Sequence, residues 1–204
     1  MHESHATVET LIGEIDALRG ARPVRRLNGG EICSSWLLRR DGEAFVLRID
    51  EPLAGALGLD RQSEVEVLKL VGDAGIGPQL AWADPARGIQ VCSYIEGPAW
   101  SGDDVHEPIL LTELAQTLAT LHQLPPQGSP FDPAQAASRY ADSIATQESA
   151  DHADRVRHLV AELDAGAGRT SLCHNDLVHG NLVGHGPVRL IDWEYAAVGD
   201  PCFD

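Results

Sequence analysis

The sequence predicts an α+β fold with two lobes, a small antiparallel β lobe followed by a larger and mainly helical lobe. Three observations support this prediction. Most segments with strand character lie before residue 96, periodic helical segments fill much of residues 109–164, and a short hairpin with polar ends follows them. Strands and helices in such separate blocks favour an α+β arrangement. We therefore expect the lobes at residues 1–96 and 97–204.

The composition limits the classes of partner and compartment. A chain of 204 residues is long enough for a real core, in one domain or in two small lobes. Its 15 basic and 31 acidic residues leave a formal charge of −16, which argues against a nucleic-acid or anionic-membrane partner. The four cysteines form no Cys-x-x-Cys pair, so we expect free thiols in the cytoplasm. No apolar run approaches membrane-spanning length, and the N-terminus lacks signal-peptide features.

The first lobe begins with a predicted amphipathic helix at residues 7–19, because apolar residues recur there every three or four positions. Strands are predicted next, at residues 24–27, 35–38 and 44–49. The Asp41-Gly42 pair between the last two strands is typical of a hairpin turn.

Residues 60–71 are predicted to form a second helix, with Asp60 as its N-terminal cap. The segment Gly75-Ile-Gly-Pro78 ends that helix. A further strand at residues 89–95 completes the first lobe and leads into a hinge at residues 96–98.

The second lobe is predicted to open with a strongly periodic helix at residues 109–122. Its inner face is formed by five leucines, Leu110, Leu111, Leu114, Leu118 and Leu121. A proline-rich loop at residues 124–133 precedes two further helical stretches, near residues 134–147 and 151–164. A hairpin around Gly184-His-Gly186 follows, because short apolar runs flank these glycines.

Four polar residues around this hairpin follow the pattern of a kinase catalytic loop and its metal-binding Asp. His174 and Asp176 form His-x-Asp, Asn181 lies five residues after the Asp, and Asp192 follows a short apolar run. Taken singly, an Asp-x-x-x-x-Asn spacing usually marks solvated loop residues, and Asp192 could be an ordinary turn former. The joint pattern is much rarer, and a hairpin would bring Asn181 and Asp192 to the same end.

The chemistry of phosphoryl transfer explains these residue types, because it needs positioning and cations more than covalent help from the protein. We expect Asp176 to be the catalytic residue, which accepts the hydrogen of an attacking hydroxyl. Asn181 and Asp192 are the expected ligands of Mg²⁺, which prefers oxygen and keeps several waters.

The first lobe offers candidate residues for binding the ATP cofactor. Strand alternation sends Phe45 and Leu47 to one face and Val46 and Arg48 to the other. Arg48 thereby occupies a position where a kinase carries a phosphate-pairing cation, although it could also be a surface arginine.

A helical Glu should hold this cation toward the phosphates. We expect Glu64 in this role, with Glu66 as the competitor. Backbone N–H groups at Gly29 and Gly30 could approach phosphates, although Gly-Gly is more often a plain turn. Backbone groups of Ser93, Tyr94 and Ile95 could bind an adenine ring.

From about residue 20 to its end, the chain resembles the choline kinase and aminoglycoside phosphotransferase superfamily, which consists of small-molecule relatives of protein kinases. The motifs are Leu-Cys-His-Asn-Asp-Leu at 172–177, Asn181, Leu-Ile-Asp-Trp-Glu-Tyr-Ala at 190–196 and Gly-Asp-Pro-Cys-Phe-Asp at 199–204. Their wording looks more like the choline, ethanolamine and thiamine kinase branch. The resemblance implies a protein-kinase-like fold, ATP and Mg²⁺, and a small-molecule hydroxyl substrate, with the roles given above for Asp176, Asn181, Asp192, Arg48 and Glu64.

Two alternatives accompany this expectation of a small-molecule kinase for a cationic alcohol such as choline or thiamine. One is an aminoglycoside-type kinase. The other is a catalytically weak nucleotide-binding remnant or interaction module, because relatives continue with further helices after the Gly-Asp-Pro segment. We therefore expect a C-terminally short second lobe whose acceptor side is largely missing.

Overall fold

A computed structural model of the chain describes residues 2–27, 32–56, 58–164 and 170–204. Its N-terminal half is built on a five-stranded antiparallel sheet with the order β1-β2-β3-β5-β4. The strands are β1 (Arg22–Arg26), β2 (Cys33–Arg40), β3 (Glu43–Asp50), β4 (Leu80–Asp84) and β5 (Ile89–Ser93). The edge strand β4 is not among the strands predicted from the sequence, because its short half-buried pattern between Pro78 and Pro85 lacks a clear alternation.

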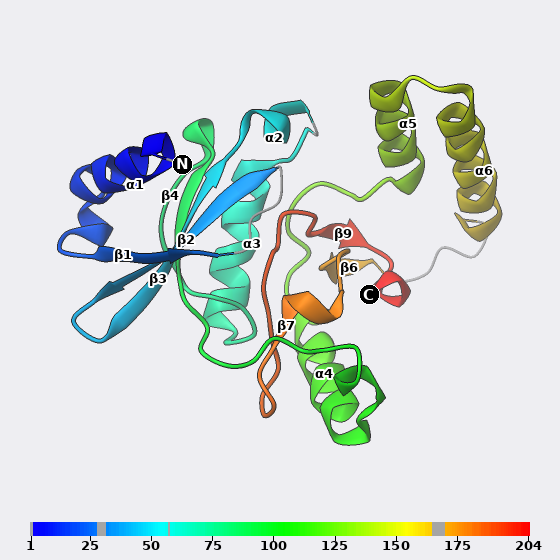
Figure 1. The fold of residues 1–204 in the computed structure, drawn as a ribbon. Helices are drawn as coiled ribbons and strands as arrows, with labels where there is room; N and C mark the ends of the chain where they lie inside the picture. The colour runs from blue at the N-terminus through cyan, green and yellow to red at the C-terminus, as the bar shows by residue number, and fades with distance from the viewer. Residues whose placement is uncertain (1, 28–31, 57, 165–169) are drawn as a thin grey trace.

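One face of this sheet is covered by the N-terminal helix α1 (His2–Glu14) and the short 3₁₀ helix η1 (Asp16–Leu18), as Figure 1 shows. The predicted single helix at residues 7–19 is thus two elements. Its apolar face packs on the sheet with Trp36, Leu38, Phe45 and Leu47. The predicted alternation of β3 is confirmed, because Phe45 and Leu47 enter this core while Val46 and Arg48 line a cavity on the opposite face.

The other face of the sheet lies against α3 (Arg61–Asp73), which follows the short helix α2 (Pro52–Ala56). The expected cap is confirmed, since the Asp60 side chain accepts a hydrogen bond from Ser63 N–H at 3.0 Å. The apolar side of α3 belongs to a core cluster that spans both halves of the chain. Its members from α3 are Val67, Leu68 and Val71, and among its members from the C-terminal half is Trp193.

Among its described residues, the C-terminal half contains three longer helices and two pairs of strands of two or three residues each. The helices are α4 (Pro108–Leu121), α5 (Pro133–Ile144) and α6 (Gln147–Asp164), and η3 (Asp104–His106) precedes them. The strands β6 (Ser171–Cys173) and β9 (Ala197–Gly199) pair with each other, as do β7 (Leu182–Val183) and β8 (Arg189–Leu190). The predicted hairpin is therefore confirmed. In Figure 1, α5 and α6 pack together as a pair that stands to one side of the sheet and of α4.

The predicted inner face of α4 is only partly correct. Leu110 and Leu121 are buried, but 43% of Leu111 is exposed. Because consecutive helical residues are turned by about 100°, Leu111 lies beside the buried stripe and not within it.

A short linking segment at residues 93–100, which begins with the last residue of β5, joins the halves and is fixed to the hairpin at its C-terminal end. Ala99 forms an isolated antiparallel bridge with Val183. Trp100 N–H donates to Leu182 O at 2.9 Å, and its indole Nε1–H donates to Gly184 O at 2.8 Å. These contacts hold the β7–β8 hairpin directly against the linking segment that follows β5. Among the described residues, no helix has the length and apolar character needed to cross a membrane.

Candidate active site

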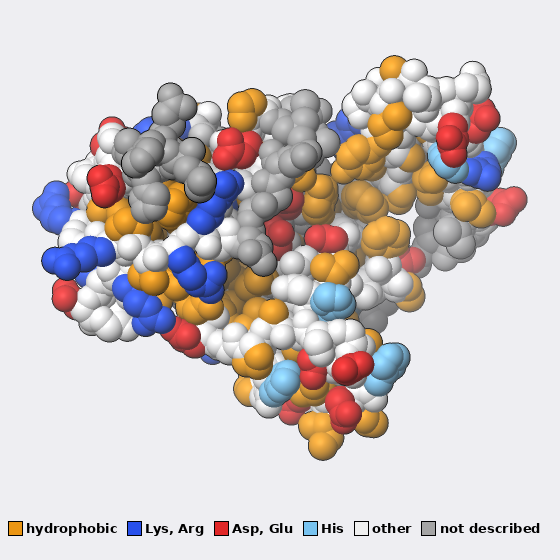
Figure 2. Space-filling view, viewed as in Figure 1, with side chains coloured by type: hydrophobic (Ala, Val, Ile, Leu, Met, Phe, Trp, Pro, Cys, Tyr) orange, Lys and Arg blue, Asp and Glu red, His pale blue; other side chains and the backbone are white. Residues whose placement is uncertain are grey.

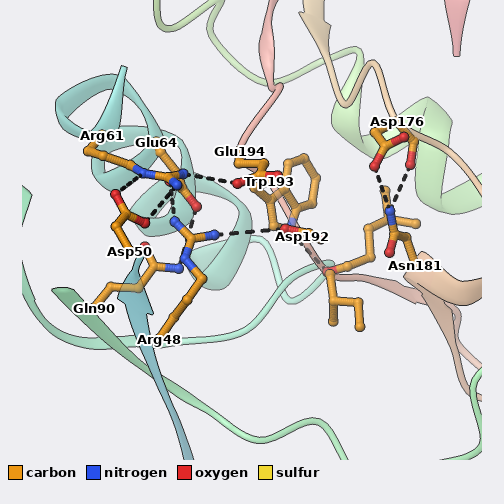
Figure 3. A network of polar contacts seen from close by, with 12 residues as sticks. Arg48, Asp50, Arg61, Glu64, Gln90, Asp176, Asn181, Asp192, Trp193 and Glu194 are labelled. Atoms are coloured by element: carbon orange, nitrogen blue, oxygen red, sulfur yellow. Dashed lines mark hydrogen bonds and ion pairs between the residues drawn. The ribbon is translucent and has the colours of Figure 1, made fainter. Parts of the chain in front are cut away.

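The loop that follows β6 carries the first two residues of the polar motif. The Asn181 side chain turns back across this loop, and its Nδ2 donates to Asp176 O at 2.9 Å and to Asp176 Oδ2 at 3.0 Å (Figure 3). The bond to Oδ2 fixes the orientation of the Asp176 carboxylate, and the two bonds together fix the Asn181 amide. They also leave the Asn181 side-chain oxygen on the opposite side of the amide, where it can bind a cation.

The backbone of this loop is held by buried groups on both sides. His174 is fully buried, and its Nε2 lies 3.0 Å from Ile191 O. The Asp204 carboxylate accepts the N–H groups of His174 at 2.9 Å and Asn175 at 2.8 Å. Burial lowers the pKa of His174 below its ordinary value, so the ring is held in the neutral form.

Asp204 also meets two other residues whose side chains could bind a metal ion. Its Oδ2 lies 3.0 Å from His122 Nε2, and Cys173 Sγ is within 4.8 Å of both groups. The carboxylate is already satisfied by two backbone N–H groups and the histidine. We therefore interpret this group as an anchor for the loop that follows β6. It also accounts for His122, the C-terminal cap residue of α4, as a partner of Asp204.

Asp192 follows β8 and faces the same cleft from the other side. Ile191 N–H donates to Asn181 O at 3.0 Å, so the hairpin brings the segments of Asn181 and Asp192 together. The Asp192 side chain is 44% exposed and therefore accessible to a ligand. Its Oδ1 lies 3.8 Å from Arg48 Nη1. Desolvation nevertheless raises the pKa of Asp192, although the charge of Arg48 opposes this shift.

Arg48 and Glu64 form a buried ion pair, with 2.5 Å between Arg48 Nη2 and Glu64 Oε2. The two side chains are 8% and 2% exposed. Burial disfavours the charge of Arg48, but the attraction of Glu64 outweighs it and raises the pKa of the guanidinium. The competitor Glu66 instead contacts Gln127, so the geometry selects Glu64 as the partner of Arg48.

A second arginine extends this pair into a network that the sequence analysis did not predict (Figure 3). Arg61 binds Asp50 through two bonds, from Nε at 2.8 Å and from Nη2 at 2.7 Å. Its Nη1 donates to Glu64 Oε2 at 2.8 Å and to Glu194 Oε2 at 3.2 Å. Burial and the nearby Asp192 charge raise the pKa of Glu194. The only sequence signal for Arg61 is its place directly after the helix cap, where a cation is unusual.

The network carries an excess of negative charge. Its two guanidinium groups face four carboxylates, those of Asp50, Glu64, Asp192 and Glu194. Two negative charges therefore remain uncompensated when all four carboxylates are ionised. A divalent cation beside Asp192 would balance them.

Two cavities meet at the catalytic loop. The first, of about 490 Å³, lies between the sheet and the β7–β8 hairpin. Asn181, Asp192 and Arg48 line it, together with Ser93, Tyr94 and Ile95 of the linking segment. Gly29 and Gly30, which we expect at the same cavity, lie outside the described residues.

The linking segment has already used part of its hydrogen-bonding capacity. Ser93 N–H donates to Gln79 O and Tyr94 N–H donates to Ala44 O, each at 2.8 Å. The N–H groups of Ser93 and Tyr94 therefore cannot bind an adenine ring as we expected. The Ile95 N–H and the backbone carbonyls are the candidates that remain.

The second cavity, of about 640 Å³, lies beside α5 and contains Asp176. Carboxylates and aromatic rings form much of its wall, including Asp132, Glu194, Phe131, Tyr140, Tyr195 and Phe203. Burial and a hydrogen bond with Tyr140 raise the pKa of Tyr195, so α5 is tied to the segment after Asp192. Figure 2 shows apolar side chains gathered between α5 and the body of the molecule. From the sequence we expect the acceptor side to be largely missing, but the described residues already line an open cavity at Asp176.

Comparisons with known proteins agree with this geometry. Residues 23–204 match the model of a family described as "Phosphotransferase enzyme family". Ethanolamine kinase 2 of Rattus norvegicus is 30% identical over 162 residues, which are 72% of this chain and 41% of the relative. The chain therefore spans less than half the length of this relative.

Solved structures share the fold. Choline kinase LicA from Streptococcus pneumoniae superposes with a TM-score of 0.80 at 23% identity, covering 96% of this chain and 71% of that one. A choline/ethanolamine kinase family protein from Mesorhizobium loti superposes with a TM-score of 0.75 at 22% identity, covering 96% and 66%. The predicted α+β, two-lobed protein-kinase-like fold is thereby confirmed.

Proposed function

Because the chain belongs to the phosphotransferase enzyme family, we propose that it transfers the γ-phosphoryl group of ATP to a hydroxyl of a small molecule. One observation carries this proposal. Asp176 lines one cavity, while Asn181 and Asp192 line the other, and the Asp176–Asn181 hydrogen bond joins the two sets. A phosphoryl donor in the first cavity and a hydroxyl in the second would meet at this point.

Asp176 is the proposed general base. A hydroxyl in the second cavity would donate its hydrogen to the carboxylate oxygen, which Asn181 holds in a fixed direction. The anchor formed by Asp204 and the buried His174 keeps the loop backbone in place, so little reorganisation is needed when the hydroxyl arrives.

The first cavity is the proposed nucleotide site. Arg48 is held by Glu64 with one edge of its guanidinium still directed toward Asp192 and the cleft, where it can bind phosphate oxygens. The linking segment at Ile95 would accept the base. Residues 1–96 would then be a nucleotide-binding lobe and residues 97–204 a catalytic lobe, as predicted from the sequence.

The residues beside Arg48 suit Mg²⁺. Asp192 and Asn181 offer a carboxylate and an amide oxygen, the ligand types this ion prefers, and the surrounding network has two uncompensated negative charges. When bound there, the ion would neutralise charge on the phosphates.

A cationic alcohol such as choline, ethanolamine or thiamine is the proposed acceptor. Four aromatic rings and several carboxylates line the second cavity, a combination that suits an ammonium group. Phe131 and Phe203 pack with their ring centroids 5.5 Å apart, and Tyr140 bonds to Tyr195 across the cavity wall. The kinship with ethanolamine kinase 2 supports the same class of acceptor.

The test is ATP consumption with Mg²⁺ and one acceptor at a time: choline, ethanolamine, thiamine and a panel of aminoglycosides. We expect turnover with an amino alcohol or thiamine, and a loss of at least about a hundredfold in kcat for Asp176→Ala. Asp103→Asn, at an exposed position outside both cavities, is the matched control and should retain wild-type turnover.

Three outcomes would redirect the proposal. Turnover with aminoglycosides alone would identify the aminoglycoside-type alternative. Mg²⁺-dependent nucleotide binding without turnover for any acceptor would favour a catalytically weak nucleotide-binding module. Unchanged turnover in Asp176→Ala would refute the assignment of the base.

A further inference from the structure

Arg61 lines neither of the two large cavities, yet its guanidinium contacts one residue associated with each of them. Glu194 forms part of the wall of the second cavity, and Arg61 Nη1 donates to its Oε2 at 3.2 Å. Glu64 holds Arg48 in the first cavity, and the same Arg61 nitrogen donates to its Oε2 at 2.8 Å. Arg61 is thus the middle of a chain of charged groups that runs between the cavities.

The links of this chain share atoms. Glu64 Oε2 accepts from both Arg48 Nη2, at 2.5 Å, and Arg61 Nη1, at 2.8 Å. Arg61 Nη1 in turn serves both Glu64 Oε2 and Glu194 Oε2. Because a change at one end alters how strongly a shared atom is held, each bond in such a chain depends on its neighbour.

The position of Arg61 is unfavourable in other respects. It stands in the first turn of α3, where a cation opposes the helix dipole, and its side chain is only 10% exposed. Desolvation of a charged group is costly unless partners compensate it. The two bonds to Asp50 fix the plane of the guanidinium and direct Nη1 toward Glu64 and Glu194 (Figure 3).

We propose that Arg61 is a positioning residue that couples the two cavities, so that the charge on Glu194 in the second cavity sets how tightly the first cavity binds nucleotide. The inference rests on the proposed function, because it assigns the first cavity to nucleotide. A phosphate that accepts hydrogen bonds from Arg48 weakens the bond from Arg48 to Glu64. Arg61 then holds Glu64 more strongly and Glu194 more weakly. By linkage, a weaker bond from Arg61 to Glu194 in turn favours the binding of phosphate to Arg48.

A double-mutant cycle on nucleotide affinity tests this coupling without any acceptor. The dissociation constant of Mg·ADP is measured by titration calorimetry for the wild type, Glu194→Gln, Arg61→Gln and the double variant. Neutralising Glu194 should tighten Mg·ADP binding, because Arg61 then competes more strongly for Glu64 and frees Arg48. The factor of tightening should be at least about threefold larger with Arg61 present than in the Arg61→Gln background.

The exposed pair Arg87–Glu14, at 3.4 Å and outside both large cavities, provides a matched control cycle. Arg87→Gln and Glu14→Gln should leave Mg·ADP affinity unchanged, alone and together. Thermal unfolding of each variant establishes that it is folded. If Arg61→Gln does not fold, Arg61→Lys takes its place. Because Lys keeps the charge but loses the fork of donors, the factor by which Glu194→Gln tightens Mg·ADP binding should then be smaller than with Arg61 but still greater than one.

The outcomes separate the two proposals. If Glu194→Gln changed the affinity for Mg·ADP by the same factor with and without Arg61, the role of Arg61 would be overturned, even if Mg·ADP bound tightly. No Mg·ADP binding by the folded wild-type chain would overturn the proposed function itself.

Discussion

Two residues of the candidate active site, Asn175 and Asp192, adopt left-handed backbone conformations, with φ of +63° and +67°. Asn and Asp tolerate this region better than other non-glycine residues. At Asn175 the side-chain Nδ2 donates to Tyr195 O at 3.0 Å, which ties the catalytic loop to the segment after Asp192. Two of the four non-glycine residues with positive φ in the described part of the chain thus lie in the segments that face each other across the cleft.

The buried imidazole of His174 makes the stability of the fold depend on pH. Burial depresses its pKa in the folded state, so the unfolded chain binds a proton more readily. The contribution of the neutral His174 to the free energy of unfolding is thus lost as the pH falls below about 6.5, the ordinary histidine pKa. The loss continues until the pH reaches the depressed pKa of the folded state. We predict that His174→Gln, which can still bond to Ile191 O, shows a smaller fall in unfolding free energy between pH 7.5 and pH 5.5 than the wild type.

Urea unfolding at a series of pH values measures this difference. The exposed His158→Gln serves as the control and should follow the wild-type profile. A His174→Gln profile parallel to that of the wild type would contradict the prediction.

At the scale of elements, α3 is the central helix of the molecule. One of its ends carries the charged network, and its apolar side packs against the C-terminal half. The sequence predicted the helix and its cap correctly, because both depend on local periodicity and on Asp60. It did not predict β4, whose status as a strand depends on pairing with β5.

In the turn after α3, the position of Gly77 is packed too closely to accept a side chain without a shift of its neighbours. A Cβ at Gly77 would lie 2.6 Å from Val71 Cγ2 and 3.1 Å from Trp193 Nε1. We predict that Gly77→Ala lowers the free energy of unfolding by about 1–3 kcal/mol, because both neighbours are buried in the shared core.

Gly13→Ala is the comparison for this change. A Cβ there meets nothing within 4 Å, and the residue lies in α1 with its surface exposed. The substitution should stabilise the protein by up to about 1 kcal/mol, since alanine is the better helix former. Denaturant unfolding of both variants gives the values, and equal effects would argue against tight packing at Gly77.

At the scale of the whole molecule, the two halves share one core cluster although they differ in secondary structure. Leu68 and Val71 from α3 are buried with Leu190 and Trp193 from the hairpin region. The predicted boundary at residues 96 and 97 therefore divides the chain between elements, but it also cuts through this core.

We predict that a fragment of residues 1–96 does not fold cooperatively on its own. Removing the C-terminal half would expose the apolar side of α3, and a small lobe has little other core to compensate. Amide signals of the ¹⁵N-labelled fragment should be poorly dispersed, and it should bind a dye that reports exposed apolar surface. A sharp thermal transition of the fragment would show that the α1 side of the sheet suffices.

The sequence by itself determined the fold class, the hairpin and the spacing of Asp176, Asn181 and Asp192, together with the strand face of Arg48. These features follow from periodicity and from separations of a few residues, which local physical chemistry controls. Only the tertiary structure decided which glutamate pairs with Arg48, placed an open cavity at Asp176 and revealed the link from Arg61 to Glu194. The contact between Arg61 and Glu194 joins residues 133 positions apart, and it exists only because the packing of α3 against the C-terminal half brings the two side chains together.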